Sequence, residues 1–137
     1  MSSASSASWP LLPPPPAVLL SFPVALFTTA LFTDITYLQT AEVQWTNFSS
    51  WLIVGALVFG GAALAWSMML ATRWRAARLY TLLLAFAWIA GLVNAFQHSR
   101  DAWSSVGTTG LILSILSTAL AIAAGWVAHG AARGMAQ

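Results

Sequence analysis

The sequence predicts an all-α integral membrane protein that folds as a bundle of four transmembrane helices. Of its 137 residues, 59% are hydrophobic and only 6% are charged, whereas a soluble domain carries about a quarter charged residues. Four apolar stretches of about 20 residues follow one another, the length that a tilted helix needs to cross a bilayer. The connecting segments are short, which makes successive helices antiparallel neighbours. We therefore expect an up-down-up-down arrangement.

The chain divides into two tails and a transmembrane domain. Residues 1–16 are rich in Ser, Ala and then Pro, and are expected to form a flexible tail. Residues 131–137 form a short C-terminal tail. The domain between them, 17–130, has spans predicted near 17–38, 50–71, 78–97 and 106–129. Because Pro23 removes a backbone donor, the first helix either begins near Ser21 or is mildly kinked at this proline.

The placement of arginines predicts the orientation of the bundle. All five basic residues are arginines; four of them fall in the second loop and the C-terminal tail, and Arg100 falls on the other side. Cytoplasmic loops are enriched in such residues, so we expect both termini in the cytoplasm of a bacterium and multi-pass insertion in its inner membrane. All of the eight tryptophans except Trp88 lie near the predicted boundaries, where indole rings prefer the headgroup level.

Small residues at four-residue spacing predict where the helices touch. Lipid tails are as apolar as leucine, so close approach and hydrogen bonds must hold the spans together. We expect one such stripe per helix to face the bundle core, and a homo-oligomer face is the alternative that the sequence leaves open. The stripes are Ser21, Ala25, Thr29 and Thr33; Ala56 with Gly60 and Gly61 with Ala65; Ala87, Gly91 and Ala95; and Ser117, Ala121 and Gly125.

A polar cluster is expected at the outer ends of the first and third spans. Asp34 is the one acidic residue clearly inside a predicted span, and ionisable residues in spans mark candidate functional sites. At 100° per residue it lies opposite the first small stripe, so we expect it to point away from the core. The cluster is interpreted either as a solvated anchor for the loop or as a partner-binding surface. Its members are Asp34, Asn94, His98, Arg100 and Asp101.

No motif of enzymatic or nucleic-acid chemistry accompanies this cluster. The absence of cysteine and a net charge of only +2 argue against a thiolate metal site and a nucleic-acid footprint. No nucleophile elbow or phosphate-binding loop occurs. His98 and His129 fall on opposite sides of the predicted membrane, about 30 Å apart, so one haem iron cannot bind both. We expect no catalytic residue, no metal and no cofactor.

Several segments resemble a family of bacterial predicted membrane proteins, domain of unknown function 2231. They are FPVALFTTALFTDITYLQTAEVQWTNFSSWLI, then AFQHSRDAW and TGLILS, and the likeness covers about residues 21–130. It implies four spans and no assigned activity. Members often begin HFP where this chain has SFP, and many carry a Gly…Asp motif after the second span and a His early in the third, which this chain lacks. Ligand roles of those family histidines are therefore not transferred to it.

Together these observations predict a non-enzymatic membrane subunit that anchors or scaffolds a membrane or periplasmic complex. Its expected partners are lipid and other protein subunits. A haem-binding electron-transfer subunit is the first alternative, which a visible absorption spectrum would identify. A small transporter or proton-path component is the second. It would need a polar file through the bundle, for which the spans offer Thr29, Thr33, Ser67, Ser114, Ser117 and Thr118.

Overall fold

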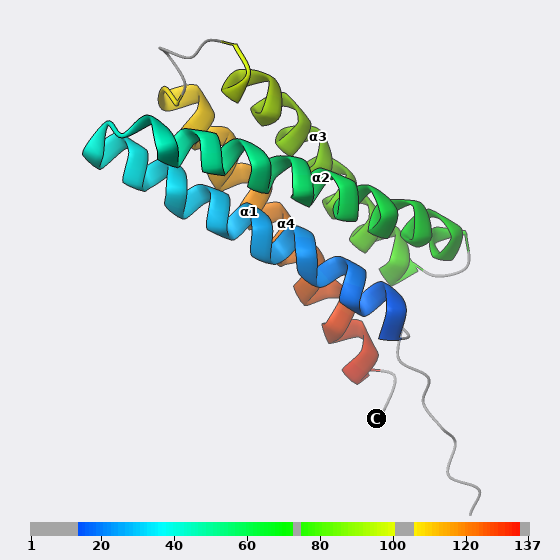
Figure 1. Cartoon of the computed structure of the whole chain (residues 1–137). Helices are drawn as coiled ribbons and strands as arrows, with labels where there is room; N and C mark the ends of the chain where they lie inside the picture. The colour runs from blue at the N-terminus through cyan, green and yellow to red at the C-terminus, as the bar shows by residue number, and fades with distance from the viewer. Residues whose placement is uncertain (1–13, 73–74, 101–105, 135–137) are drawn as a thin grey trace, which may run out of the picture.

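The structure confirms the all-α, four-helix fold. It is a computed structural model that describes residues 14–72, 75–100 and 106–134. Each helix packs against two neighbours, and the first and last helices close the ring (Figure 1). The described residues contain no strand. The helices are α1 (Pro14–Thr40), α2 (Val43–Ala71), α3 (Arg75–His98) and α4 (Thr108–Gly134).

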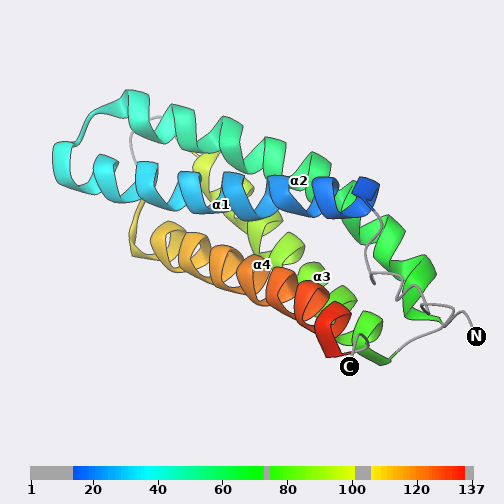
Figure 2. The same ribbon diagram turned by 90° about the horizontal axis from the view of Figure 1, so that it is seen from below.

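The two ends of the bundle are distinct. The start of α1 and the end of α4 lie at one end, which we call the terminal end (Figure 2). The α1–α2 turn lies at the opposite end, which we call the turn end. This turn consists of Ala41, in the left-handed region with φ of 57°, and the extended Glu42. A connection this short makes α1 and α2 an antiparallel hairpin.

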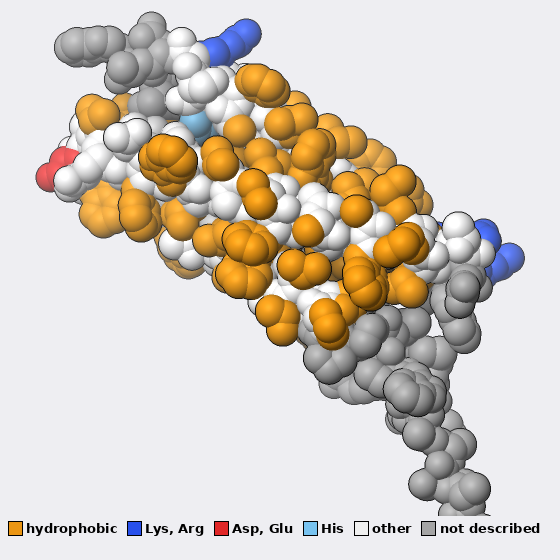
Figure 3. Space-filling model, turned by 45° about the vertical axis from the view of Figure 1, so that its right-hand side comes forward, with side chains coloured by type: hydrophobic (Ala, Val, Ile, Leu, Met, Phe, Trp, Pro, Cys, Tyr) orange, Lys and Arg blue, Asp and Glu red, His pale blue; other side chains and the backbone are white. Residues whose placement is uncertain are grey.

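All four helices are long and apolar enough to cross a membrane. The 27 residues of α1 extend over about 40 Å at 1.5 Å per residue, more than the ~30 Å of a hydrocarbon core. Large apolar side chains such as Phe32, Trp51, Phe96 and Trp126 point outwards. Figure 3 shows hydrophobic side chains over the length of the bundle and charged ones gathered at its ends. This surface suits a lipid environment.

Each helix buries one seam of residues, spaced alternately by three and four positions. A mean period of 3.5 keeps one face of each helix against its neighbours and is characteristic of left-handed bundles. The seam residues are Leu20, Pro23, Phe27, Ala30 and Asp34 in α1; Thr46, Ser49, Ile53, Ala56, Gly60, Ala63 and Ser67 in α2; Ala77, Tyr80, Leu84, Ala87, Gly91, Asn94 and His98 in α3; and Gly110, Ser114, Ser117, Ala121, Ala124 and Ala128 in α4.

Large and small seam residues face one another across the core. A Cβ added at Gly91 would come within 2.5 Å of the tip of the Phe27 ring, so this ring occupies the space that the glycine leaves. A Cβ at Gly60 would lie 3.4 Å from Pro23. Trp88 donates from its indole Nε1 to the carbonyl oxygen of Leu57 at 2.9 Å, which joins α3 to α2. The glycines of α2 and α3 thus leave room for the bulky residues of α1.

The small stripe predicted for α1 is wrong as a core face. Ser21, Ala25 and Thr29 are exposed, and Thr33 is the one buried member. The core face of α1 carries bulky residues because the glycines of α2 and α3 supply the space. The stripes predicted for the other helices agree better with the observed burial. Their buried members are Ala56, Gly60, Ala87, Gly91, Ser117 and Ala121, whereas Ala65 is exposed.

The helices extend beyond the predicted spans. α1 begins at Pro14, within the predicted 1–16 tail, because prolines in a first turn need no intrahelical donor; residues 1–13 lie outside the described part. The helix continues through Pro23, so it does not begin at Ser21. α2 begins at Val43 instead of near Ser50, which shortens the first loop. α4 reaches Gly134, beyond the expected boundary at 130.

Substituting Gly91 by Ala should destabilise the bundle by about 1–3 kcal/mol, the usual cost of overpacking a core, because the methyl group collides with the buried Phe27 ring. Reversible unfolding of the purified protein in detergent, followed by circular dichroism, measures the effect. Gly130→Ala is the matched control, since a Cβ there meets nothing within 4 Å. Equal stability of the two variants would contradict the assigned contact.

Candidate functional site

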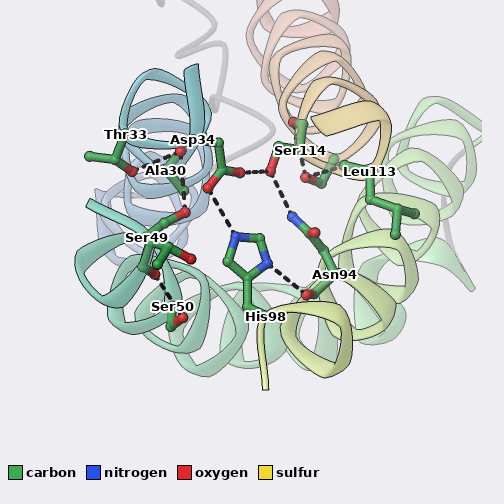
Figure 4. A network of polar contacts seen from close by, with 11 residues as sticks. Ala30, Thr33, Asp34, Ser49, Ser50, Asn94, His98, Leu113 and Ser114 are labelled. Atoms are coloured by element: carbon green, nitrogen blue, oxygen red, sulfur yellow. Dashed lines mark hydrogen bonds and ion pairs between the residues drawn. The ribbon is translucent and has the colours of Figure 1, made fainter. Parts of the chain in front are cut away.

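A buried polar network joins three helices near the turn end. Its members are Asp34 on α1, Asn94 and His98 on α3, and Ser114 on α4, and we call them the Asp34 network (Figure 4). Asp34 and Asn94 are fully buried, and Ser114 is 1% exposed. Four polar side chains at membrane depth are costly unless they satisfy one another.

The seam geometry brings these residues together. Asp34 follows Phe27 by seven positions, so the two lie on the same face of α1. Asn94 and His98 are four positions apart, one turn along α3. Ser114 belongs to the seam of α4, next to α1 and α3. Because every seam faces the core, each of these side chains points inward at the same level.

Four hydrogen bonds connect the network. Asp34 Oδ1 lies 2.9 Å from His98 Nε2, and Ser114 Oγ donates a short hydrogen bond to Asp34 Oδ2. The amide of Asn94 donates from Nδ2 to Ser114 Oγ at 2.7 Å. His98 Nδ1 lies 2.9 Å from the backbone oxygen of Asn94. The bonds form a ring that begins and ends at Asn94.

The hydrogen-bond pattern determines how many protons the Asp34–His98 pair holds. A backbone carbonyl can only accept, so His98 Nδ1 must carry the proton that it shares with Asn94. The contact between Nε2 and Asp34 Oδ1 needs one more proton, on either atom. The pair is therefore an imidazolium with a carboxylate, or a neutral imidazole with a carboxylic acid. In both forms it holds one shared proton and has no net charge.

Hydroxyl groups around the network tie other helices to α1. Ser49 Oγ on α2 donates to the backbone oxygen of Ala30 at 3.3 Å, an oxygen that also accepts from Thr33 Oγ1 of α1 itself at 2.8 Å. Thr118 Oγ1 on α4 donates to the backbone oxygen of Phe27 at 3.0 Å. These bonds hold α2 and α4 against the segment of α1 that carries Asp34.

One buried atom of the network has no hydrogen-bond partner among the described residues, and this atom is Asn94 Oδ1. Gly110 of α4 packs beside it, since an added Cβ there would lie 3.8 Å from this oxygen and 3.9 Å from His98 Cε1. A buried acceptor left unpaired costs about 1–3 kcal/mol. The network therefore combines satisfied bonds with one acceptor that retains hydrogen-bonding capacity.

The predicted outer cluster is partly assembled and partly wrong. The structure unites Asp34, Asn94 and His98, as expected from their common level. Asp34 points into the core and not away from it, because the relevant face of α1 is the 3.5-residue seam and not the small stripe. Arg100 is exposed and has no bond to the network. Asp101 lies outside the described residues.

Sequence reasoning missed Ser114 as a member of this site. Serine is common in membrane helices and rarely signals function by itself. A heptad count along the last span would have identified it, since Ser114, Ser117, Ala121 and Ala124 continue one seam. The same count on α1 would have placed Asp34 with Phe27 in the core.

A second feature is an open groove between α1 and α4 in the half of the bundle near the terminal end. Its volume is about 570 Å³, and it is lined by the exposed stripe of α1, together with Thr28, Ile122, Gly125 and His129. The hydroxyl groups along it are already committed, since Ser21, Thr28 and Thr29 donate to carbonyl oxygens of their own helix. His129 Nδ1 lies 2.8 Å from the oxygen of Gly125. The groove therefore presents a mainly apolar surface.

The described residues contain no group of three or more His, Cys, Asp or Glu side chains that could hold a metal ion. His98 lies at the turn end, while His129 lies in the terminal half of α4. Both ring nitrogens of His98 are bonded inside the network. A haem iron or metal would have to displace Asp34 to reach its Nε2.

Comparison with known families agrees with the resemblance noted in the sequence. The family model described as "Predicted membrane protein (DUF2231)" matches residues 15–132, which include all of the seams and the complete Asp34 network. No curated protein and no solved structure matches the chain.

Replacing Ser114 by Ala should lower the free energy of unfolding by about 1–3 kcal/mol, because it leaves Asn94 Nδ2 and Asp34 Oδ2 without partners. Ser117→Ala is the matched control: it removes an equally buried hydroxyl one turn away, whose bonds go only to carbonyl oxygens of α4. Unfolding in detergent compares the two. Losses of equal size would show that the network contributes nothing beyond a buried hydroxyl.

Proposed function

We propose that this chain, which belongs to the DUF2231 family of predicted membrane proteins, is a multi-pass, non-enzymatic subunit that binds a transmembrane helix of another protein chain. The observation that carries this proposal is the α1–α4 groove. It opens sideways from the bundle, and its walls combine a stripe of small residues with apolar side chains.

The chemistry of the groove favours a helix as its occupant. Ser21, Ala25 and Thr29 lie four positions apart on one face of α1, and Gly125 faces them from α4. Small residues at this spacing let helix backbones approach closely in a membrane. A polar small molecule would find few free donors, since the hydroxyl groups of α1 are bonded to their own helix. A helix needs no such donors, because its own backbone is satisfied internally.

The proposed docking surface is the groove and not the outer cluster predicted from the sequence. The outer cluster included Asp34, Asn94 and His98, but these side chains are buried and bonded to one another. A partner could reach them only by opening the bundle. The groove needs no rearrangement, and it uses the very stripe that was expected in the core. We retain the scaffold role and assign it to the membrane-embedded surface.

We further propose that the termini face the cytoplasm of a bacterial cell. The support is the excess of arginine at the terminal end, where Arg75 and Arg78 begin α3, against Glu42 in the turn at the opposite end. Positive charge is retained on the cytoplasmic side of bacterial inner-membrane proteins. The turn end, with the Asp34 network below it, would then face outwards.

Cysteine labelling tests the orientation, and the chain has no native cysteine to interfere. Gln44→Cys places a thiol at the turn end and Thr72→Cys places one at the terminal end; both positions are exposed. An impermeant maleimide added to intact cells should label the first variant and spare the second until the cells are opened. The reverse pattern would overturn the orientation.

Photo-cross-linking tests the groove. A benzophenone side chain introduced at Thr29 should form a covalent adduct with a peptide from a membrane helix, identified by mass spectrometry. The same group at Val58, an exposed position of α2 outside the groove, should not. Ala25→Leu fills the groove and should abolish the Thr29 adduct, whereas Ala65→Leu, exposed on α2, should leave it intact. Adducts with lipid alone would refute helix docking.

A further inference from the structure

The Asp34 network has no role in helix docking, yet it holds a titratable pair inside the bundle. We infer that Asp34 and His98 form a proton-binding site, which keeps the turn end closed while it holds its shared proton and lets this end open when the proton leaves for water. The inference stands on the geometry of the pair, its burial and its position at the end of α3.

The closed state holds one proton by its hydrogen bonds. His98 Nδ1 donates to Asn94, and a single further proton joins Nε2 to Asp34 Oδ1 over 2.9 Å. Both side chains of the pair are completely buried. No other ionisable side chain of the described residues is bonded to the pair. The charge balance of this site therefore depends on that one proton.

Loss of the proton makes the closed state untenable. A carboxylate oxygen would then face the lone pair of a neutral imidazole nitrogen, and an uncompensated negative charge would be buried at membrane depth. Relief requires water. His98 is the last residue of α3, and Ser99 and Arg100 directly after it are exposed. In the inferred open state, displacement of this helix end brings water to the pair.

Few ionisable side chains surround the Asp34–His98 pair, so the pair itself is the titrating group. On α1, Tyr37 follows Asp34 by nearly one turn; on α2, residues 43–53 carry no ionisable side chain, and Glu42 before them is exposed. On α3 the one neighbouring charge is Arg100, which is exposed, and residues 108–118 of α4 carry none. Asp101 lies outside the described residues, so the experiment includes a variant at this position.

The direction of the pH effect follows from proton counts. In the open state both side chains face water, where an aspartic acid loses its proton near pH 3.9 and an imidazolium near pH 6.5, approximately. Above about pH 6.5 the open state thus holds no proton and the closed state holds one. Raising the pH favours opening, and a difference of one proton changes the equilibrium constant about tenfold per pH unit.

Thiol accessibility reads out the opening. Ser49→Cys places a thiol at a fully buried position of α2, beside the segment of α1 that carries Asp34. Asn47→Cys places one at an exposed position of the same helix, which corrects for the pH dependence of thiol reactivity itself. The ratio of the two maleimide rates, measured in detergent or nanodiscs, should rise by up to tenfold per pH unit above about pH 6.5.

Variants test whether the Asp34–His98 pair causes the rise of the rate ratio with pH. In Asp34→Asn the amide can donate to a neutral His98 Nε2 and still accept from Ser114, so the closed state is preserved without a shared proton. Its rate ratio should be flat above about pH 6.5. His129→Gln and Asp101→Asn should keep the wild-type rise. A rise that persists in Asp34→Asn, or is absent from the wild type, would overturn the inference.

A spectroscopic measurement covers the case in which Asp34→Asn fails to fold. The chain has two histidines, so ¹⁵N-histidine labelling of His129→Gln leaves His98 as the one labelled residue. Both ring nitrogens should show protonated or hydrogen-bond-shared signals while the bundle is closed. An Nε2 signal of a bare acceptor in the closed protein would show that no proton is shared and would refute the site.

Discussion

Close packing along a seam of period 3.5 is the constraint on which the rest of the structure depends. In hydrocarbon the helices gain nothing from excluding water, so they are held by contact and by hydrogen bonds between helices. Phe27 reaches into the space left by Gly91, and Pro23 lies against Gly60. These contacts set the rotation of each helix about its axis, and this rotation decides which other side chains face inward.

The Asp34 network is a consequence of that rotation. Once Phe27 faces the core, Asp34 must face it also, two turns further along α1. The bundle accommodates the acid because His98, Ser114 and Asn94 occupy the corresponding seam positions of α3 and α4. A lone carboxylate there would be energetically unfavourable, whereas a pair that shares one proton is neutral. The polar site thus belongs to the packing of the helices and cannot be altered independently of it.

The same rotation leaves the small stripe of α1 on the outside. Ser21, Ala25 and Thr29 do not serve the bundle core, and together with α4 they form the wall of an open groove. Two surfaces of one helix therefore have separate roles. The bulky face holds the bundle together and positions a proton-sharing pair near the turn end. The small face, closer to the terminal end, lines the groove in which we propose that another helix docks. A change at one face should leave the other largely intact, since they lie on different sides of α1.

Much of the fold was decided by the sequence alone. Composition, the length of the apolar stretches and the short loops determine a four-helix membrane bundle, because backbone groups in hydrocarbon must be satisfied within each helix. The common level of Asp34, Asn94 and His98 also follows from the positions of the spans. The sequence did not determine the direction in which Asp34 points, because α1 offers two plausible inward faces. Only packing against Gly91 and Gly60 of the neighbouring helices selects between them, and with that choice come the partnership with Ser114 and the exposure of the small stripe.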